Sequence, residues 1–467
     1  MTLDPTTASA AEIAGAVRAG SITAGQVTEA VLAVIRTRGK ALNAFTAVTE
    51  ERARAKAAAI DAQRAQGGAP DALGPLAGVP FAVKNLFDVA GLPTLAGSKI
   101  NREHPPATRD ATLIERLEAA GAILVGALNM GEYAYDFTGE NVHDGPSRNP
   151  HDTARMTGGS SGGSGGAVAG RLVPLSLGSD TNGSIRVPAS LCGIFGLKPT
   201  YGRLSRARSF PFVASLDHLG PFARSVGDLA LAYDAMQGHD LADPVCVERS
   251  AEPTLPHIDD GIEGLKIAVA AGYFRKGAAP EALTALERVA TALAVSREIE
   301  IPEAARARAA AYVITATEGA ALHLIRLRTC ANDFDPAVRD RLIAGAMVPA
   351  TLVNKAQKFR RWYRARALEL FADVDVILAP ATPCTAPLIG QQTFVLDGVE
   401  LPVRANLGIY TQPISFIGLP VVAVPVSLKP LPIGVQIIAA PWREDVALKV
   451  ARALERAGVV AAPAPTL

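Results

Sequence analysis

The sequence predicts an α/β fold built on a mixed, mostly parallel β-sheet. Through the centre of the chain, short apolar runs typical of buried strands alternate with segments of helical periodicity. Hydrophobic residues make up 49% of the chain and charged residues 19%, so we expect a large core and no extensive disorder. Neither an internal repeat nor a clear domain boundary interrupts the alternation. We therefore expect one large domain over residues 1–467.

The first stretch of the chain, residues 8–66, is expected to be helical. Apolar residues recur at spacings of three and four in Ala11–Ala16, Val27–Ile35 and Arg52–Arg64. Thr23 is a candidate N-cap, with Gln26 in the capping-box position three residues later. Thr49 is a second candidate cap without the box. These segments favour a helical layer packed on a core over any chemical role.

The apolar run Gly78–Val83 predicts a buried strand that ends directly on Lys84. A lysine in this place is usually a solvated surface charge, and the sequence alone favours that interpretation. The alternative is a lysine held in an apolar site, where desolvation lowers its pKa as a general base requires.

The remaining elements follow in alternation. Further strands are expected at Ile123–Val125, Leu172–Leu177, Leu265–Ala271, Val374–Ala379, Pro420–Val426 and Gly434–Ile438. Helices are expected at Ala111–Ala120, Ser225–Met236, Pro280–Ala294, Glu444–Glu455 and most of residues 314–371. In the last of these we expect Trp362 and Leu368 to be buried. Asn149–Met156 does not resemble a strand, and the polar, aromatic segment Asn129–Gly145 is expected to be a loop that lines a pocket.

Two Gly/Ser-rich turns, Thr157–Gly166 and Gly178–Ser184, lie in the middle of the predicted sheet. Backbone N–H groups at such turns, where a helix starts, form a site for a negatively charged oxygen. Serines presented there suggest a hydroxyl nucleophile beside an oxyanion hole. A flexible linker is disfavoured because both flanks are apolar and periodic. A phosphate cradle lacks its motif, and the pattern G-x-S-x-G matches three overlapping times, so it discriminates little.

Charge and cysteine content exclude several classes of protein. The net charge is +1, which gives no electrostatic footprint for nucleic acid or an anionic membrane. Four scattered cysteines without C-x-x-C, and the absence of H-E-x-x-H, argue against a disulfide framework or a metal site. No signal peptide or spanning apolar run is evident, so a cytoplasmic protein without a membrane segment is expected.

Three motifs resemble those of the amidase signature family, and the match extends over nearly the whole chain. They are GVPFAVKNLFD, GGSSGGSGGAVA and GSDTNGSIRVPASLCGIFGLKPTYGRLS, with a weaker match in LPIGVQIIAAP. The resemblance implies a single domain whose twisted sheet is covered by helices on both faces. Residues 1–66 would form an N-terminal helical layer, residues 67–240 the catalytic core, and residues 250–467 the rest of the sheet with its covering helices.

The resemblance also implies a Ser–cis-Ser–Lys triad. Ser184 would be the nucleophile, Ser160 the bridging serine after a cis peptide bond, and Lys84 the base. The oxyanion hole would be formed by the N–H groups of Thr181, Asn182, Gly183 and Ser184, with Ser161, Asp180 and Arg186 in supporting positions. No metal and no organic cofactor is implied.

This triad is chemically coherent. Neutral Lys84 would take the proton of Ser160 while Ser160 takes that of Ser184. For half of the Lys84 side chains to be neutral at pH 7, the pKa must fall from about 10.4 to about 7, which costs roughly 4–5 kcal/mol. Burial at the end of an apolar strand produces changes of that size.

Two departures from the family pattern suggest the substrate class. Asn85 stands where the family commonly has Asp, and Asn182-Gly183 where it commonly has Gly-Gly, so a side chain at position 182 would narrow the pocket. With YDFTGENVHDGPSRNPHD, these departures resemble the branch that acts on biuret-type ureido compounds, such as 1-carboxybiuret, in s-triazine breakdown. That branch implies a homodimer or a heterotetramer with a small helical accessory subunit.

Substrate-binding residues are expected in two places. Tyr133, Tyr135 and Asp136 follow the N-M-x-E segment, after which the family places residues that line the substrate. His323, Arg326 and Arg328 are candidates for a carboxylate anchor because arginine binds carboxylates in a bidentate manner. The ordinary roles of helix-face residues remain the alternative for each of them.

Two other functions remain open from the sequence. One is the glutaminase-type subunit of a tRNA-dependent amidotransferase, which the near-neutral charge mildly disfavours. The other is a non-catalytic scaffold that binds a partner, which the presence of all three triad residues disfavours. The leading hypothesis is an amide hydrolase that acts on a small-molecule substrate.

Overall fold

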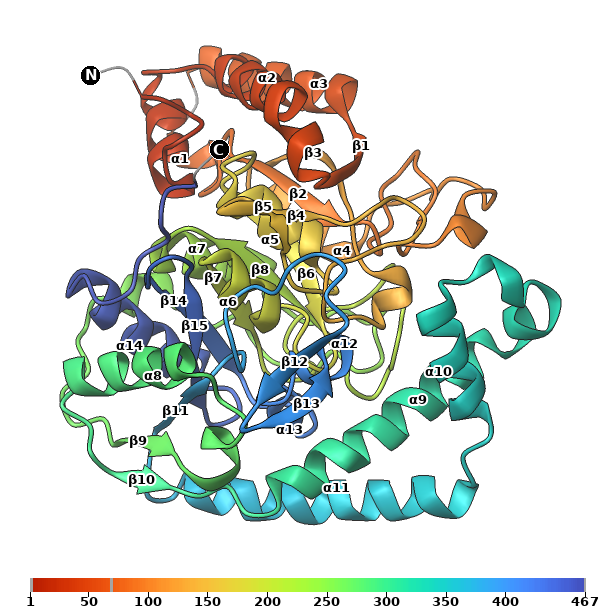
Figure 1. The fold of residues 1–467 in the computed structure, drawn as a ribbon. Coiled ribbons are helices and arrows are strands. Elements are labelled where there is room, and N and C mark those ends of the chain that lie inside the picture. Colours follow the sequence, from red (N-terminus) through yellow and green to blue (C-terminus); the bar gives the residue numbers. More distant parts are fainter. Residues whose placement is uncertain (1–2, 68–69, 466–467) are drawn as a thin grey trace.

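One mixed β-sheet of 11 strands organises the molecule, in the order β1-β3-β2-β6-β8-β7-β14-β15-β11-β9-β10 (Figure 1). The structure is a computed structural model, and it describes residues 3–67 and 70–465. The strands are β1 (Phe45–Val48), β2 (Pro80–Lys84), β3 (Ile123–Leu128), β6 (Leu175–Asp180), β7 (Phe195–Lys198), β8 (His218–Ala223), β9 (Ile267–Ala270), β10 (Glu298–Ile299), β11 (Val376–Pro380), β14 (Val421–Val426) and β15 (Ile433–Ala439). The α/β class and the mixed sheet are confirmed.

Parallel pairing is confined to two blocks of the sheet. Strands β3, β2 and β6 are parallel neighbours, and so are β11, β9 and β10. Antiparallel strands β8, β7, β14 and β15 join the two blocks. Every residue of β2 and β6 is buried, as strands in the interior of a sheet covered on both faces should be. The parallel block of β2 and β6 brings the C-terminal ends of both strands to the same edge, where the candidate site lies.

Helices cover both faces of the sheet. The helices of the first half are α1 (Ala10–Ala19), α2 (Ala24–Leu42), α3 (Glu50–Ala65), α4 (Thr112–Ala119), α5 (Gly162–Ala169), α6 (Arg186–Cys192) and α7 (Val226–Met236). Those of the second half are α8 (Pro280–Ala292), α9 (Ala304–Thr329), α10 (Pro336–Ala346), α11 (Ala350–Leu370), α12 (Val403–Asn406), α13 (Gln412–Ser415) and α14 (Glu444–Arg456). α4, α7 and α14 pack on one face, and α2, α5, α6 and α8 pack on the other.

Residues 8–66 form three helices as expected, except that strand β1 lies between α2 and α3. Thr23 caps α2 through a complete capping box with Gln26, whereas Thr49 precedes α3 without a side-chain cap. Helix α14 has a sharply divided apolar face that packs on β14 and β15. The division into residues 1–66, 67–240 and 250–467 remains a prediction, and its ends at residues 1–2 and 466–467 lie outside the described residues.

Helices α9, α10 and α11 form a helical arm that crosses below the sheet in Figure 1. The expected burial of Trp362 is wrong, because it is 44% exposed on α11, where its ring lies at a tilt against that of Phe359. Leu368 is partly buried against the core. Tyr363, one residue from Trp362, occupies the buried face instead. The error is one of helical phase within an arginine-rich segment that has few apolar residues to define its inner face.

Two small ribbons lie outside the main sheet. β4 (Arg148–Asn149) pairs with β5 (Asp152–Met156), and β12 (Thr393–Leu396) pairs with β13 (Val399–Pro402). The expectation that Asn149–Met156 contains no strand is therefore wrong. β5 is polar because most of its residues are only partly buried, so its sequence lacks the apolar run of a core strand.

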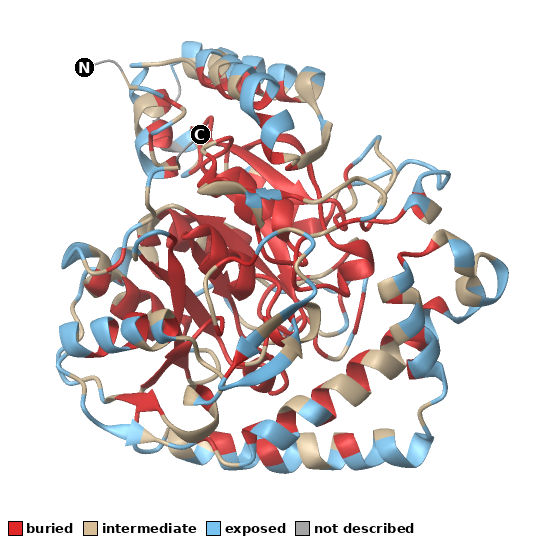
Figure 2. Cartoon of the chain, in the orientation of Figure 1, coloured by how far each residue is buried: buried red, intermediate tan, exposed pale blue. Residues whose placement is uncertain are grey.

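Burial is continuous from the central sheet through the helices that cover it (Figure 2). A second, smaller apolar cluster joins Phe137, Met156 and Val187 to the segment around Val403 and Leu407. Within residues 3–67 and 70–465, no helix is long and apolar enough to cross a membrane.

Candidate active site

Lys84 ends strand β2 inside the protein, with no exposed side-chain surface. Its Nζ donates hydrogen bonds to Ser160 Oγ at 2.7 Å and to Ser179 Oγ at 2.9 Å. Burial lowers the pKa of Lys84 to about 7, although the charges of Asp217, Asp180 and Asp136 oppose the change. The solvated surface charge that the sequence alone favoured is wrong at this position. A buried amine of this kind is half neutral near pH 7.

Ser160 lies in the turn that leads into α5, one residue before the helix cap Ser161. The peptide bond between Gly159 and Ser160 is cis, as the resemblance implied. Ser161 ties this turn to β6, because its Oγ donates to the carbonyl of Ser179 at 3.2 Å and accepts from the N–H of Ser179 at 3.3 Å. The two Gly/Ser-rich turns are therefore joined directly, and both hydroxyl partners of Lys84 belong to them.

The loop Thr181–Ser184 connects β6 to α6 at the same edge of the sheet. The side chain of Ser184 is buried and lines a small cavity. Within the described part of the chain, the N–H groups of Thr181, Asn182, Gly183 and Ser184 donate to no protein acceptor. These N–H groups are therefore free to donate to an oxygen bound beside Ser184.

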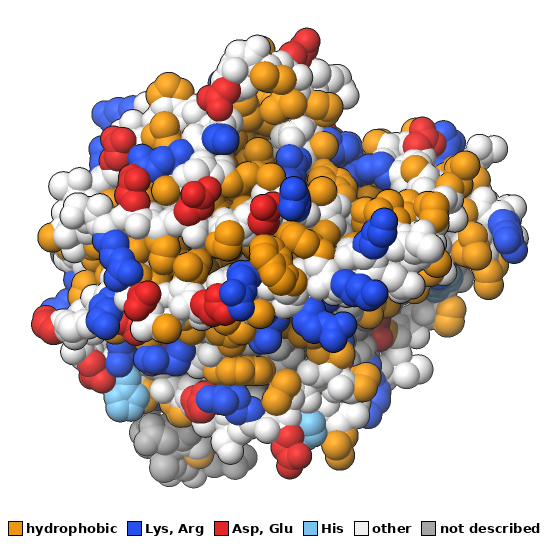
Figure 3. All heavy atoms as spheres, turned by 90° about the horizontal axis from the view of Figure 1, so that it is seen from below, with side chains coloured by type: hydrophobic (Ala, Val, Ile, Leu, Met, Phe, Trp, Pro, Cys, Tyr) orange, Lys and Arg blue, Asp and Glu red, His pale blue; other side chains and the backbone are white. Residues whose placement is uncertain are grey.

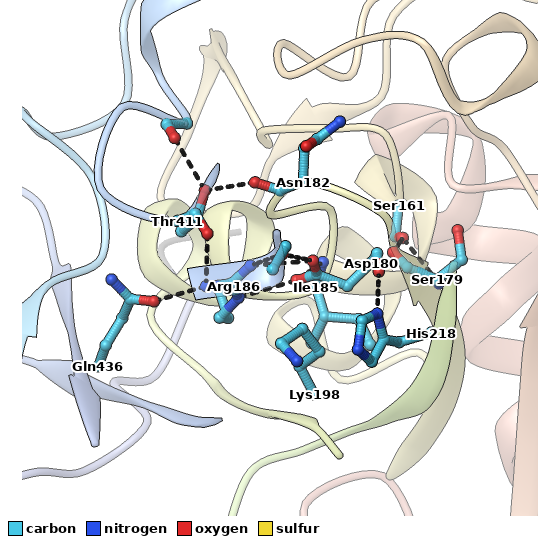
Figure 4. A network of polar contacts seen from close by, with 12 residues as sticks. Ser161, Ser179, Asp180, Asn182, Ile185, Arg186, Lys198, His218, Thr411 and Gln436 are labelled. Carbon is cyan, nitrogen blue, oxygen red and sulfur yellow. Dashed lines mark hydrogen bonds and ion pairs between the residues drawn. The ribbon is translucent and has the colours of Figure 1, made fainter. Parts of the chain in front are cut away.

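A fully buried ion pair closes the base of this loop (Figure 4). Arg186 binds both carboxylate oxygens of Asp180, at 2.9 and 3.0 Å, so the ion pair joins the two flanks of the loop. Burial would raise the pKa of Asp180, but the Arg186 guanidinium holds that pKa well below its usual value. Arg186 also donates to Gln436 Oε1 at 2.7 Å, which links the loop to strand β15.

Thr411 holds the loop from the C-terminal part of the chain. Its Oγ1 donates to the carbonyl of Asn182 at 2.7 Å, and its own carbonyl accepts from Arg186 at 3.1 Å (Figure 4). Gly183 has φ of +147°, and a Cβ there would collide with the Thr411 hydroxyl. Only glycine fits this position.

The cavity of Ser184 is lined by six separate segments of the chain. Its lining residues are Ala134, Tyr135, Asp136, Phe137, Thr181, Asn182, Ser184, Phe212, Tyr312, Thr315, Arg341 and Gln412. A second cavity of about 240 Å³ shares Ala134, Thr181 and Phe212 with the first and reaches Ser179. The loop Asn129–Gly145 thus lines the pocket as expected from its sequence. Among the described residues, no group of His, Cys, Asp or Glu side chains is placed to hold a metal ion.

Arg341 is the basic side chain in the wall of the Ser184 cavity. It donates to the backbone carbonyls of Ala337, at 2.7 Å, and Tyr135, and its guanidinium lies 3.9 Å from the centre of the Tyr135 ring. No carboxylate within the described residues forms an ion pair with it. Burial lowers its pKa, and the charge of Asp136, which lines the same cavity, opposes the change. A largely buried guanidinium without a counter-ion favours an anionic ligand.

The residues predicted to bind substrate divide into two groups. Tyr135 and Asp136 line the cavity. Tyr133 is buried beside it, where its ring packs on His323 and its hydroxyl donates to Asn101. His323, Arg326 and Arg328 are not among the lining residues: His323 is buried in an aromatic cluster, Arg326 stacks on Phe210, and Arg328 is exposed.

Sequence reasoning missed Ser179, Thr411 and Arg341. Ser179 is adjacent to the motif residue Asp180, and its position two residues from Leu177 on the same strand could have placed it on the inner face. Arg341 lies in an arginine-rich helical segment, and Thr411 in a segment without motif. Their proximity to Ser184 depends on long-range packing of α9, α10 and α13, for which the local sequence carries no signal.

The fold and the site define the chain as an amidase, and the comparison with known families agrees. The chain belongs to the amidase family, whose model matches residues 26–448. It is 54% identical over 451 residues to AtzE, a subunit of the 1-carboxybiuret hydrolase of Pseudomonas sp. (strain ADP). The matched residues make up 96% of this chain and 98% of that protein.

Other relatives lie in the same family. A component of the glutamyl-tRNA(Gln) amidotransferase of Chloroflexus aurantiacus is 36% identical over 94% of both chains. Among solved structures, an inhibitor-bound complex of an s-triazine catabolic enzyme superposes with a TM-score of 0.96 at 52% identity, covering 98% of this chain and 100% of the other. The single-domain amidase fold expected from the sequence is confirmed, as is hydrolase chemistry on a carbon–nitrogen bond.

Proposed function

We propose that this chain hydrolyses a carbon–nitrogen bond of a small biuret-type ureido substrate, such as 1-carboxybiuret, and releases ammonia. The observation that carries the proposal is the buried Lys84–Ser160 hydrogen bond, 2.7 Å long, at the edge of the sheet where Ser184 lines a cavity. The substrate class is supported by the 54% identity to a chain of 1-carboxybiuret hydrolase over nearly the whole of both chains.

In the acylation step, neutral Lys84 accepts the proton of Ser160 while Ser160 accepts that of Ser184. The Ser184 oxygen attacks the amide carbonyl, and the N–H groups of Thr181, Asn182, Gly183 and Ser184 are the donors available to the negative oxygen that develops. The proton then returns through Ser160 to the departing nitrogen, the carbon–nitrogen bond breaks, and ammonia leaves. Water hydrolyses the acyl-enzyme by the reverse proton relay.

Arg341 supports an anionic substrate. Its guanidinium lines the same cavity as Ser184 and has no carboxylate partner among the described residues. A substrate carboxylate bound there would supply the missing counter-ion and fix the orientation of the carbonyl. In this proposal Arg341 takes the role that the sequence suggested for Arg326 or Arg328.

We further propose that the chain works with a small helical accessory subunit, in a homodimer or a heterotetramer. The solved neighbour that superposes with a TM-score of 0.96 is a protein complex. On the helical arm, large apolar side chains remain exposed to solvent: Leu322, Leu324, Ile325, Ile343, Met347 and Leu352. Exposed apolar side chains gathered on one part of the molecule favour a protein interface. Basic side chains spread over the lower face of the molecule, which includes α11, with apolar atoms between them (Figure 3).

The test compares Ser184→Ala with Ser164→Ala in ammonia release from 1-carboxybiuret, biuret, allophanate and glutamine. Ser164 is a fully buried serine of the first Gly/Ser-rich turn, and its hydroxyl donates to the carbonyl of Leu177 at 3.0 Å. We expect Ser184→Ala to lose turnover on ureido substrates and Ser164→Ala to retain it. Full activity of Ser184→Ala would disprove the proposal. Turnover of glutamine alone, increased by a partner and tRNA, would support the role in a tRNA-dependent amidotransferase instead.

A further inference from the structure

The side chain of Asn182 stands in the catalytic loop, where the family commonly has glycine. It is only 7% exposed and lines the same cavity as Ser184, two residues away. In Figure 4 this side chain leaves the loop on the side away from the Asp180–Arg186 ion pair. The backbone of Asn182 is fixed separately, because its carbonyl accepts from Thr411. The side chain can therefore contact a ligand in the cavity while the backbone of the loop stays in place.

The two ends of the Asn182 amide differ in their hydrogen bonding. Nδ2 donates to Thr315 Oγ1 at 3.0 Å, from the buried face of α9. Oδ1 is buried and has no hydrogen-bond partner within the described residues. A buried acceptor without a partner costs about 1–3 kcal/mol, so such groups are uncommon in native proteins and call for an explanation. The bond to Thr315 leaves Oδ1 as the atom that the amide offers to a ligand.

We infer that Asn182 Oδ1 accepts a hydrogen bond from a substrate N–H group next to the carbonyl that Ser184 attacks. The inference rests on the proposed function and narrows its substrate class. A ureido compound carries an N–H on that side of the carbonyl. An acyl amide such as glutamine carries a methylene there, and a methylene leaves Oδ1 without a partner. Asn182 is thus a specificity residue that selects ureas over carbon-chain amides, while Arg341 binds the anionic end.

Biuret and malonamide isolate this hydrogen bond, because they differ only in an N–H that is replaced by a CH₂. Each would be measured as a competitor that protects Ser184 from labelling by a fluorophosphonate probe. In the unsubstituted protein we expect biuret to protect about 10- to 100-fold better than malonamide, the ratio that one buried hydrogen bond supplies. Asn182→Leu, which keeps the volume and removes the acceptor, should reduce this ratio to near one. Protection by malonamide should not change.

Two further variants keep the test decisive. Asn182→Gly restores the glycine pair of the family and removes the acceptor without adding bulk, so it should also lose the preference for biuret. Thr315→Ser retains the hydroxyl that holds Nδ2 and should retain the preference. Equal protection, or none, by the two competitors in the unsubstituted protein would overturn the inference, as would a preference that survives in Asn182→Leu and Asn182→Gly. Failure of the probe to label Ser184 at all would instead overturn the proposed function.

Discussion

At the scale of single residues, the chemistry depends on the burial of one amine. Among the residues that the structure describes, Lys84 and Lys198 are fully buried, and burial lowers the pKa of each to about 7. Lys198 donates to the backbone carbonyls of Pro199 and Leu419, whereas Lys84 donates to Ser160 and Ser179. Only Lys84 is therefore placed to exchange protons with a serine. The same desolvation that makes it a base also opposes folding, since the unfolded chain keeps the lysine protonated.

This leads to a prediction for the pH dependence of activity. The base must be neutral, so kcat/KM should fall about tenfold per pH unit below about 7 and level off above it. Lys84→Arg should be inactive at every pH, because a guanidinium does not deprotonate. Lys198→Met serves as the matched control, and its kcat/KM should fall with decreasing pH in the same way as that of the unsubstituted protein. The profile is measured by ammonia release in buffers of constant ionic strength, and a rate independent of pH across this range would contradict the assignment.

His323 gives a second prediction at the same scale. Both ring nitrogens are buried without a partner among the described residues, and the ring centre lies 4.0 Å from that of Tyr133. Burial, reinforced by the charge of Arg326, lowers the pKa of His323 to about 3. The unfolded chain takes up a proton near pH 6.5 and the folded chain does not, so stability is lost as the pH falls from about 6.5 toward 3.

His323→Phe should remove this loss and the unpaired nitrogens together. We expect it to raise the free energy of unfolding by about 1–3 kcal/mol, more at pH 5 than at pH 8. Urea unfolding at the two pH values measures the difference. An equal gain at both would show that protonation of His323 contributes nothing to acid sensitivity.

At the scale of elements, the glycine-rich helix α5 shows why the Gly/Ser run is not a linker. A Cβ at Gly163 would lie 2.5 Å from the carbonyl oxygen of Asn129 and 2.6 Å from that of Ala44. The helix thus packs directly on the backbone of neighbouring segments, which fixes the turn that carries Ser160. Gly166, one turn further along, has only ordinary contacts, the nearest at 3.4 Å.

The two glycines predict opposite effects of the same substitution. Gly163→Ala should destabilise by at least about 1–3 kcal/mol, because backbone atoms must move to admit the methyl group. Gly166→Ala should be neutral or stabilising by about 0.5–1 kcal/mol, since alanine loses less entropy in a helix. Thermal and urea unfolding of both variants test this contrast, and equal effects would show that the close packing of α5 is unimportant.

Most of the helices and strands could be predicted from the sequence, and the exceptions have physical causes. Apolar runs in the sequence predict the positions of β2, β11 and β14, and the capping box predicts the start of α2. The strand after the first turn begins at Leu175 rather than Leu172, because the apolar run also serves the connection from α5. β5 was missed because it is a partly exposed strand. Lys84 was ambiguous because its role depends on what covers the strand end, and only distant segments decide that.

Asn85 illustrates the same limit. Its departure from the family pattern was visible in the sequence, but its role was not. In the structure its Oδ1 accepts from the N–H of Gly97 at 3.0 Å and its Nδ2 donates to Thr46 at 3.2 Å. The side chain therefore joins strand β1 and the loop at Gly97 to the end of β2, and it forms no hydrogen bond with Ser160. Arg341 shows the converse, since no motif marks it and packing of α10 brings it to the cavity.

At the scale of the whole molecule, the exposed apolar side chains of the helical arm predict that the protein associates with a partner or a second copy through this surface. Ile325 is 76% exposed and Met347 78% exposed, both on the surface of the arm and neither in the wall of the Ser184 cavity. Replacing both by lysine should weaken assembly with a partner or a second copy by at least about tenfold, because charged groups are costly in an apolar interface. Light scattering coupled to gel filtration measures the mass with and without the co-expressed partner.

The control for this prediction is the activity per labelled serine. It should remain unchanged in the unassembled double variant if the arm serves assembly alone. A double variant that assembles as tightly as the unsubstituted protein would exclude this surface as the interface.

The order of the strands also has a consequence for biosynthesis. β14 and β15, from the C-terminal part of the chain, stand between β7 and β11 and connect the two parallel blocks. Until residue 439 has left the ribosome, the nascent chain holds two half-sheets with unpaired inner borders, and such borders are prone to aggregate. A premature stop codon anywhere before that point would therefore yield not a weakened enzyme but a substrate for chaperones and proteases.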